Sequence, residues 1–524
     1  MTGIRAARYA ALFLWVGLAA LSSAVSAQDV TLTSRDGKVE IVGDLLGFDG
    51  EFYRVDTVYG ELTLDGSGVD CAGPGCPNLE DYVAQATFSG SPTIGRVLMP
   101  ALIEAFAIKD SYNLEREEPQ SGTILFRLSE RVDAGRVLGE FRFRLTNSEE
   151  GFADLLANEA DIAMSMREIT QEELKLGKDA GLGDMSRRGR ARVLALDALV
   201  PVVSPSNPVQ SVTLSGLASI LAGVTDNWQA LGGPDAPIAV HLFGPKTGIG
   251  QATESLVLKP SGAELGGDVT MHSDGLALEA AVKNDPFAFG ITAQAEAGDN
   301  WQLDLSGNCG FALTATRRAV KTEDYPLTAP LFLYLPARRL PKMVREFIAF
   351  LQEPTAQLVI RRAGFVDQAP EEIAIKEQGN RFANAIAQAG GEVGLTQLQE
   401  MVKTLSPMKR LTTTFRFEAG STGLDAQSRS NVQRLARSLQ LGLYDARKVI
   451  FVGFSDGEGR AAANRKIAQR RAEAVKDAVL LAAENLNLER LDLTVEAFGE
   501  VLPMACDESA WGRQVNRRVE VWVR

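Results

Sequence analysis

The chain of 524 residues has few of the side chains that form metal centres, with only two histidines and four cysteines. Because a zinc site needs several nitrogen or sulfur ligands, we expect neither a metal site nor a cofactor. Basic charge is also scarce: 54 Lys and Arg residues stand against 67 Asp and Glu residues, a net charge of −13. Without a sustained basic face, a nucleic-acid partner is not expected.

Long apolar runs are missing from the chain after its N-terminal segment. No later segment reaches the roughly 18 uninterrupted apolar residues of a membrane span. At the N-terminus, Arg5 and Arg8 precede the apolar run Tyr9–Leu21, and small residues follow up to Ala27. Residues 1–27 are therefore predicted to be a secretory signal peptide. No cysteine lies near the cleavage site, so we expect a soluble exported protein without a lipid anchor.

Catalytic constellations are missing as well. His241 lies in an alternating strand pattern and His272 in a polar loop, and neither has a recognisable partner. No nucleophile elbow, Walker loop or metal-spaced cluster is present. Glu149 and Glu150 are adjacent on a predicted helix and do not face each other. We expect that the protein is not an enzyme.

The length predicts two to four domains. Residues 28–84 alternate in the manner of β-strands and form a small module of unreadable function. Within it, Cys71 and Cys76 bracket Ala-Gly-Pro-Gly, which favours a disulfide in an oxidising compartment. The pairing of Cys309 and Cys506 stays open.

Residues 85–365 alternate short apolar strands with amphipathic helices, which predicts an α/β fold with parallel sheets. Three loops place small or hydroxyl residues just before a helix. They contain Ser91 and Thr93, Ser148, and Thr247 and Gly248. Each can direct backbone N–H groups, a hydroxyl and a helix dipole towards one place. If they converge, they form a metal-free oxyanion cleft; the alternative is that Ser91, Ser148 and Thr247 are ordinary N-caps.

Residues 366–408 read as a helical connector, and residues 409–524 as a βαβαβ domain of helices on a sheet. In this last domain Asp456 follows the apolar run Val449–Val452, and Arg471 falls inside the helical pattern Ala461–Glu484. Helical spacing puts Arg471 at the centre of the face expected to be buried. A buried guanidinium needs an anion, so Asp456 and Arg471 are candidates for a charged pocket; a structural salt bridge is the alternative.

The last domain resembles the OmpA-like peptidoglycan-binding domain over residues 409–524. The motifs are Gly453–Gly459, Asn464, Gln469–Ala472, Phe498–Glu500 and Asn516–Val521. The resemblance implies that Asp456 and Arg471 hold the ammonium and carboxylate groups of diaminopimelate in peptidoglycan stem peptides, with Asn464, Asn516 and Arg517 in the same site. One departure is Phe454-Ser455, where the family usually has His-Thr. The resemblance implies a Gram-negative periplasm, associated with the cell wall and outer membrane.

Residues 85–365 resemble the phosphate-binding periplasmic protein of ABC transporters, on Asp161–Arg167, Pro201–Val209 and Leu214–Trp228. The resemblance implies two α/β lobes of the type II periplasmic-binding fold hinged around a ligand. Its phosphate sites fall on Ser91 and Thr93, Ser148, Ser165 and Arg167, and Thr247 and Gly248.

Several departures bear on the ligand. Phe243 stands where the family has Arg, Met166 where it often has Asp, and Ile249 follows Gly248 in place of Thr. Glu149 and Glu150 would each repel a dianion by about 4 kcal/mol per charge pair at a separation of about 4 Å and an effective dielectric near 20.

Two functions remain. The first is a periplasmic solute-binding protein for phosphate or a related oxyanion, anchored to peptidoglycan, with an ABC permease as an open partner. The second is a non-transport envelope scaffold or signalling protein that uses a degenerate binding-protein domain.

Overall fold

The computed structural model describes residues 29–131, 135–187, 189–307, 312–389, 392–417, 423–484 and 486–524. The predicted signal peptide and Cys309 lie outside these residues. The chain divides into two compact units, one ending at Tyr82 and the other running from Val83 to Arg524. None of the described helices combines the length and the apolar character that a membrane crossing requires.

The first unit is an antiparallel sheet in the order β4-β3-β2-β1-β5. Alternate residues of two strands turn inward, and Val30, Leu32, Tyr53 and Val55 form the core. Cys71 and Cys76 form the predicted disulfide. The elements are β1 (Val30–Ser34), β2 (Glu40–Phe48), β3 (Phe52–Thr57), β4 (Gly60–Asp65), η1 (Gly66–Gly68) and β5 (Val69–Ala72).

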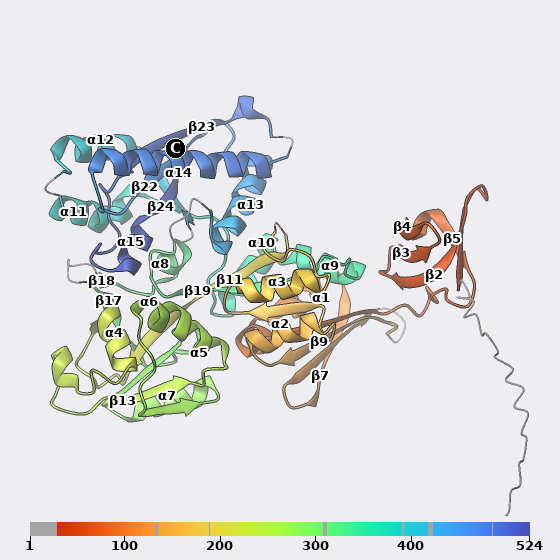
Figure 1. Cartoon of the computed structure of the whole chain (residues 1–524), viewed down its shortest axis with the longest axis horizontal. Coiled ribbons are helices and arrows are strands. Elements are labelled where there is room, and N and C mark those ends of the chain that lie inside the picture. The colour runs from red at the N-terminus through yellow and green to blue at the C-terminus, as the bar shows by residue number, and fades with distance from the viewer. Residues whose placement is uncertain are drawn as a thin grey trace, which may run out of the picture. The chain divides into compact units, whose positions relative to one another are not determined.

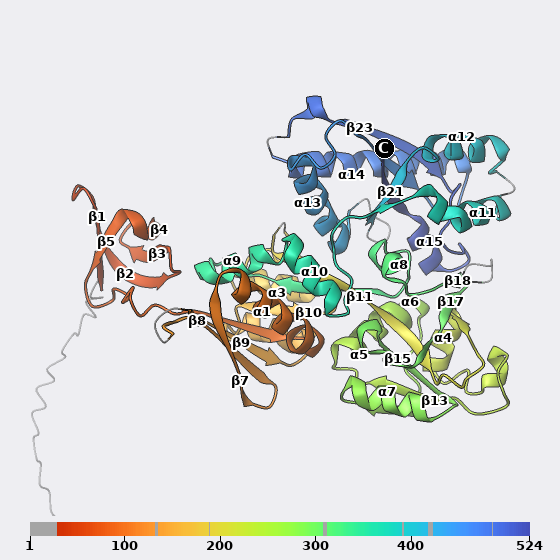
Figure 2. The ribbon, with the colours of Figure 1, turned by 180° about the vertical axis from the view of Figure 1, so that it is seen from behind.

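The second unit begins with two α/β lobes that share one 11-stranded sheet, in the order β14-β13-β15-β11-β19-β10-β6-β9-β8-β7, with β16 on β11. We call residues 84–195 and 328–366 lobe 1, and residues 199–327 lobe 2. The long antiparallel strands β11 (Ala191–Val203) and β19 (Thr328–Tyr334) connect them. In Figure 2 the green elements of lobe 2 gather apart from the orange and yellow elements of lobe 1.

Lobe 1 has a mixed sheet where the sequence predicted a parallel one. β6 pairs in parallel with β9 and β10, but β7 and β8 form an antiparallel hairpin around Gly122, whose φ of +77° suits a tight turn. Its elements are β6 (Ala84–Gly90), η2 (Thr93–Leu98), α1 (Met99–Lys109), β7 (Tyr112–Gln120), β8 (Thr123–Glu130), β9 (Val137–Leu145), α2 (Ser148–Leu156), β10 (Ile162–Ser165), α3 (Gln171–Asp179), α9 (Lys342–Phe350) and α10 (Pro354–Arg362).

Lobe 2 is built on β13, β14 and β15, which are parallel. Lobe 2 also contains a separate three-stranded sheet in the order β12-β17-β18. The elements are β12 (Ser211–Thr213), α4 (Leu214–Leu221), η3 (Trp228–Leu231), β13 (Ala239–Phe243), α5 (Gly248–Thr253), η4 (Glu254–Leu258), α6 (Lys259–Ser261), β14 (Val269–His272), α7 (Gly275–Asn284), β15 (Ala288–Ala293), η5 (Gln294–Glu296), β16 (Trp301–Gln302), β17 (Asp304–Ser306), β18 (Ala312–Leu313) and α8 (Arg317–Lys321).

The C-terminal domain has a five-stranded sheet in the order β20-β21-β24-β22-β23, and α14 is the long blue helix of Figure 1. Its elements are β20 (Glu372–Ile373), η6 (Ile375–Gln378), α11 (Gly379–Ala387), α12 (Leu395–Leu405), β21 (Lys409–Arg416), α13 (Ala426–Gln440), β22 (Lys448–Phe454), α14 (Ala461–Ala482), η7 (Leu488–Arg490), β23 (Asp492–Gly499), α15 (Ala510–Asn516) and β24 (Arg518–Val523).

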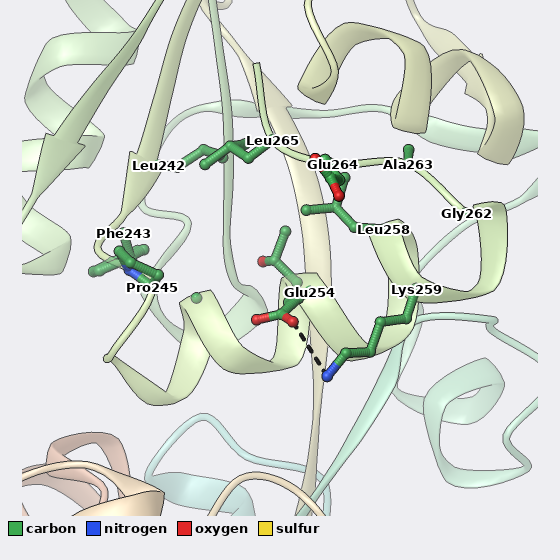
Figure 3. A pocket seen from close by; sticks show the side chains of 12 residues that line it. Leu242, Phe243, Pro245, Glu254, Leu258, Lys259, Gly262, Ala263, Glu264 and Leu265 are labelled. Carbon is green, nitrogen blue, oxygen red and sulfur yellow. Dashed lines mark ion pairs between the residues drawn. The ribbon is translucent and has the colours of Figure 1, made fainter. Parts of the chain in front are cut away.

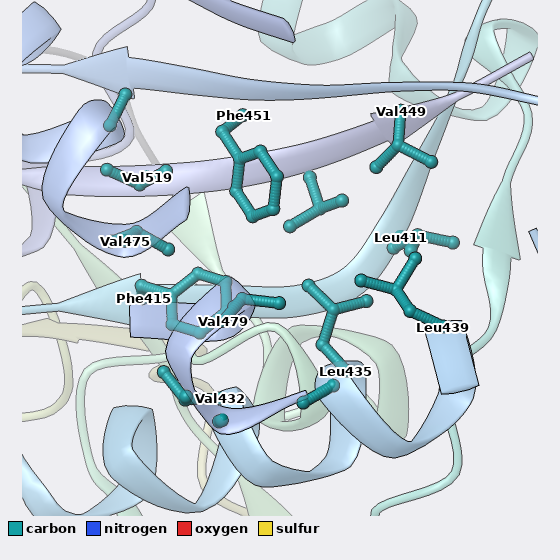
Figure 4. Packing of buried hydrophobic residues seen from close by; sticks show 14 of the residues in the cluster. Leu411, Phe415, Val432, Leu435, Leu439, Val449, Phe451, Val475, Val479 and Val519 are labelled. Atoms are coloured by element: carbon teal, nitrogen blue, oxygen red, sulfur yellow. The ribbon is translucent and has the colours of Figure 1, made fainter. Parts of the chain in front are cut away.

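Strand β22 is buried on both faces of this sheet. Val449 and Phe451 pack with α13 and α14 in the cluster of Figure 4, whereas Ile450 and Val452 pack with α11 and α12. Successive side chains of a strand point to opposite faces, so each face requires its own helical layer. The segment expected to be a connector therefore supplies helices to the second core.

Candidate functional site

Asp456 lies just beyond the C-terminal end of β22, with 9% of its surface exposed. The strand can approach α14 closely because residue 453 is glycine: a Cβ there would lie 2.1 Å from the carbonyl oxygen of Ala468. Asp456 Oδ2 accepts a hydrogen bond of 2.7 Å from Nη1 of Arg517. Asp456 is thus paired with Arg517, and Asp456 and Arg471 are not bonded to each other.

Arg471 has no ion-pair partner among the described residues. Its Nε is buried without a hydrogen bond, and its guanidinium carbon lies 5.2 Å from the centroid of the Phe417 ring. Burial and the nearby Arg517 lower the pKa of Arg471 from its usual value, and Asp456 acts in the opposite direction. A half-buried cation next to a carboxylate is suited to bind the carboxylate end of a zwitterion.

The predicted orientation of α14 needs a correction, because Arg471 lies at the edge of the buried face. Ile467 lies one helical turn before Arg471, on the face that was expected to be buried, and is 37% exposed. The face is rotated because β22 packs on the smallest residues of the helix. The buried residues are Asn464, Ala468, Ala472, Val475, Val479 and Ala482.

The two asparagines hold the surrounding loops. Asn464 Nδ2 donates to Glu500, while Asn516, fully buried, accepts from the N–H groups of Met504 and Ala505. The amide of Asn516 also donates to the Ala505 carbonyl and to Asp507. These bonds fix the loop that carries Arg517 beside Asp456.

In the two-lobed part, the three predicted loops and the Ser165–Arg167 turn meet near Ser91. A Cβ on Gly248 of lobe 2 would lie 3.3 Å from Ser91 Oγ and 2.7 Å from Met166 Sδ, both of lobe 1. The Ser148 hydroxyl accepts from the Met166 N–H at 3.2 Å. These four residues therefore lie together where the two lobes meet, at the place of the predicted oxyanion cleft. The Ser91 hydroxyl is fully buried there and has no hydrogen-bond partner among the described residues.

The capping alternative holds for Thr247 alone. Its hydroxyl accepts from the Gly250 N–H and donates to the Gly244 carbonyl. The cap of α2 is Asn147, one residue before Ser148. The residue at the cap position of the π-helical turn η2 is Pro92, so the Ser91 hydroxyl caps no helix. The Ser91 and Ser148 hydroxyls are therefore not used as caps.

Arg167, the predicted cation of the cleft, is neutralised by a neighbouring carboxylate. Arg167 forms a two-pronged ion pair with Glu173, at 2.9 and 2.7 Å, and stacks on Phe152. Ser165 bonds only within its own turn, to the backbone of Arg167. Thr93 donates to Glu296 of lobe 2 at 3.3 Å, and burial raises the pKa of that carboxyl. The cleft offers hydroxyl and backbone donors, and an acidic neighbour.

Phe243 lines a different cavity of about 500 Å³ inside lobe 2 (Figure 3). Leu242, Leu258 and Leu265 make it largely apolar, and an ion pair of 3.2 Å between Glu254 and Lys259 lies at its edge. This cavity has no oxyanion-binding character.

The two histidines, which sequence reasoning left without partners, bond to each other. His241 Nδ1 and His272 Nε2 lie 2.9 Å apart on the neighbouring strands β13 and β14. The predicted polar loop around His272 is a strand. Only the register of these strands, which the sequence does not reveal, brings the rings together.

Residues 139–355 match the PBP superfamily domain, and residues 416–517 match the OmpA family. The chain therefore joins a PBP-type domain to a C-terminal OmpA domain, as the two resemblances predicted. It is 25% identical over 211 residues to the phosphate-binding protein PstS of Borreliella burgdorferi, covering 39% of this chain and 71% of that protein. Protein SphX of Synechococcus elongatus is 29% identical over 228 residues, 41% of this chain and 65% of SphX. Outer membrane protein A of Bordetella avium is 31% identical over 105 residues, 20% of this chain and 51% of its own length.

Proposed function

We propose that the protein is a binding protein of the cell envelope, exported to the periplasm and anchored to peptidoglycan through Asp456 and Arg471. The observation that carries this proposal is the half-buried guanidinium of Arg471, which has no ion-pair partner in the described part of the chain. It lies near the carboxylate of Asp456, which is paired with Arg517. In the proposed complex the ammonium of diaminopimelate replaces Arg517 on Asp456, and its carboxylate pairs with Arg471. Asn464, Asn516 and Arg517 complete the site by shaping its wall.

The proposed solute is phosphate or a related small oxyanion, bound between the lobes by Ser91, Ser148 and Gly248. The similarity to a protein named for phosphate binding, PstS of Borreliella burgdorferi, supports it. The buried, unpartnered Ser91 hydroxyl also supports it, because such a group is costly unless a ligand or water meets it. Thr93, Ser165, Arg167 and Thr247 act in this proposal through the backbone turns they hold. Transport with an ABC permease belongs to the same proposal.

A second candidate is an envelope scaffold or signalling protein whose cleft no longer takes an oxyanion. The ion pair between Arg167 and Glu173 favours it, since Arg167 is then not free to bind an oxyanion. Met166 favours it too, because its sulfur lies close against Gly248 in the predicted cleft.

Two measurements test the proposals separately. In the first, the full chain without residues 1–27 is co-sedimented with purified peptidoglycan sacculi. We expect binding that is lost in Asp456→Ala and in Arg471→Ala; binding that survives both changes refutes the assigned site. In the second, calorimetry with inorganic phosphate distinguishes a solute-binding cleft from the scaffold, for which no heat is expected.

A further inference from the structure

The PBP-type domain and the OmpA domain are joined by buried ion pairs. Arg410 of β21 donates to both carboxylate oxygens of Asp324, at 2.6 and 3.0 Å, with its own side chain 1% exposed. Its Nε lies 3.3 Å from Glu520, which is also completely buried. Removing one partner from such a network leaves an uncompensated buried charge, so the two domains cannot separate freely.

These contacts reach both lobes. On lobe 1, Glu168 accepts from the Ala426 N–H at 2.9 Å and from Arg429 at 3.1 Å, both at the start of α13. Glu168 directly follows Arg167 in the cleft turn. On the other side, Glu323 and Asp324 belong to the segment that leads from α8 of lobe 2 into the hinge strand β19. Opening of the lobes must therefore change contacts with the OmpA domain.

Arg416 connects this interface with the peptidoglycan pocket. Its guanidinium donates to the Glu323 carbonyl oxygen of lobe 2 and, at 2.7 Å, to the Val515 carbonyl oxygen of the OmpA domain. Val515 is two residues before Arg517, which holds Asp456. The residue after Arg416 is Phe417, whose ring lies against Arg471. A single buried side chain thus touches the hinge segment and the turn that leads to Arg517, and the residue that follows it in sequence lies against Arg471.

We propose that Arg416 is a positioning residue that couples attachment to peptidoglycan with the arrangement of the two lobes. When an ammonium group replaces Arg517 on Asp456, the turn 515–517 changes its position, and Arg416 transmits this change to Glu323 and the hinge. Thermodynamic linkage makes this coupling reciprocal. The factor by which peptidoglycan changes the affinity for a ligand of the lobes equals the factor by which that ligand changes the affinity for peptidoglycan. The inference rests on the proposed binding of diaminopimelate at Asp456 and Arg471.

The test uses the full chain without residues 1–27 and a tripeptide ending in diaminopimelate. Binding is measured by calorimetry, and backbone hydrogen exchange is followed in β11, β19 and residues 322–327. We expect the tripeptide to slow or accelerate exchange there several-fold in the wild-type chain, since the OmpA domain is fastened to this segment. In Arg416→Gln we expect the tripeptide still to bind while the change in lobe exchange disappears.

The matched control is Arg447→Gln, which removes a guanidinium bonded to Glu372 in the same domain, away from Val515 and Glu323. It should keep the wild-type exchange response. If the tripeptide binds the wild-type chain and exchange in the lobes stays unchanged, the coupling is refuted while wall binding stands. If the tripeptide does not bind at all, the proposed function fails and the inference with it. Where Arg416→Gln folds poorly, the wild-type measurement still decides whether the lobes and the OmpA domain are coupled. Arg416→Lys, which keeps the charge, is then the second variant at this position.

Discussion

Asp456→Asn is the most informative single change in the proposed peptidoglycan site around Asp456 and Arg471, the wall pocket, because it keeps the size of the side chain and removes its charge. The ammonium of a diaminopimelate peptide would lose a charge-assisted hydrogen bond of about 1.5–3 kcal/mol. In the empty protein, however, Asp456 is already bonded to Arg517, so the ligand exchanges one ion pair for another. We therefore expect the lower end of the range, roughly a tenfold increase in Kd.

The assay is calorimetric titration of the chain without residues 1–27 with the tripeptide. The effect on folding should be moderate, because the amide keeps the size of the side chain and Arg517, whose side chain is 24% exposed, can turn to water. The control is Glu458→Gln. It removes the same charge two residues further along the chain, from a side chain that is 78% exposed. It should bind as the wild type does. An unchanged Kd in Asp456→Asn, or an equal loss in Glu458→Gln, refutes a specific role for Asp456.

The remaining predictions concern the cleft and the domain interface. Ser91→Ala should abolish phosphate binding and leave the melting temperature unchanged or higher, because the buried hydroxyl has no partner among the described residues. Ser89→Ala, which removes a hydrogen bond to Asp154, should lower the melting temperature. Gly248→Ala should fold but bind no phosphate by calorimetry, since its Cβ would press the flexible end of Met166 into the cleft; retained phosphate affinity contradicts the assigned cleft. Burial raises the pKa of Glu323 to about 8 from an ordinary 4.5, so the carboxyl stays protonated in the folded chain while it ionises in the unfolded one. Its contribution to stability is then lost as pH rises from about 4.5 to about 8, and Glu323→Gln should raise the melting temperature by a few degrees more at pH 8.5 than at pH 5.5; an equal difference at both pH values contradicts this.

The elements of the C-terminal domain could be predicted because strand and helix periods are local. The strand Lys448–Phe454 and the start of α14 at Ala461 agree with the apolar patterns. The exact face of α14 could not be predicted, because it depends on which small residues β22 approaches. For the same reason no spacing pointed to Phe417, which only the packing of β21 against α14 brings to Arg471.

The cleft shows the same division. The convergence of Ser91, Ser148 and Gly248 follows from three loops that precede helices, and the sequence indicated it. The neutralisation of Arg167 did not follow, although Glu173 lies six residues away in the sequence. Thr170 caps α3 and Glu173 completes the capping box, which places its carboxylate in front of the guanidinium.

The two candidate sites differ in their electrostatics, and this difference orders the proposals. In the proposed peptidoglycan site, Arg471 is a half-buried cation with no ion-pair partner among the described residues, a state that favours an incoming carboxylate. In the cleft, the cation is neutralised, and a partly buried acid faces Thr93. An oxyanion there must rely on neutral donors, each of which contributes about 1 kcal/mol net, whereas a charge-assisted bond contributes about twice as much. Wall binding should therefore be the stronger of the two interactions and the first to be detected.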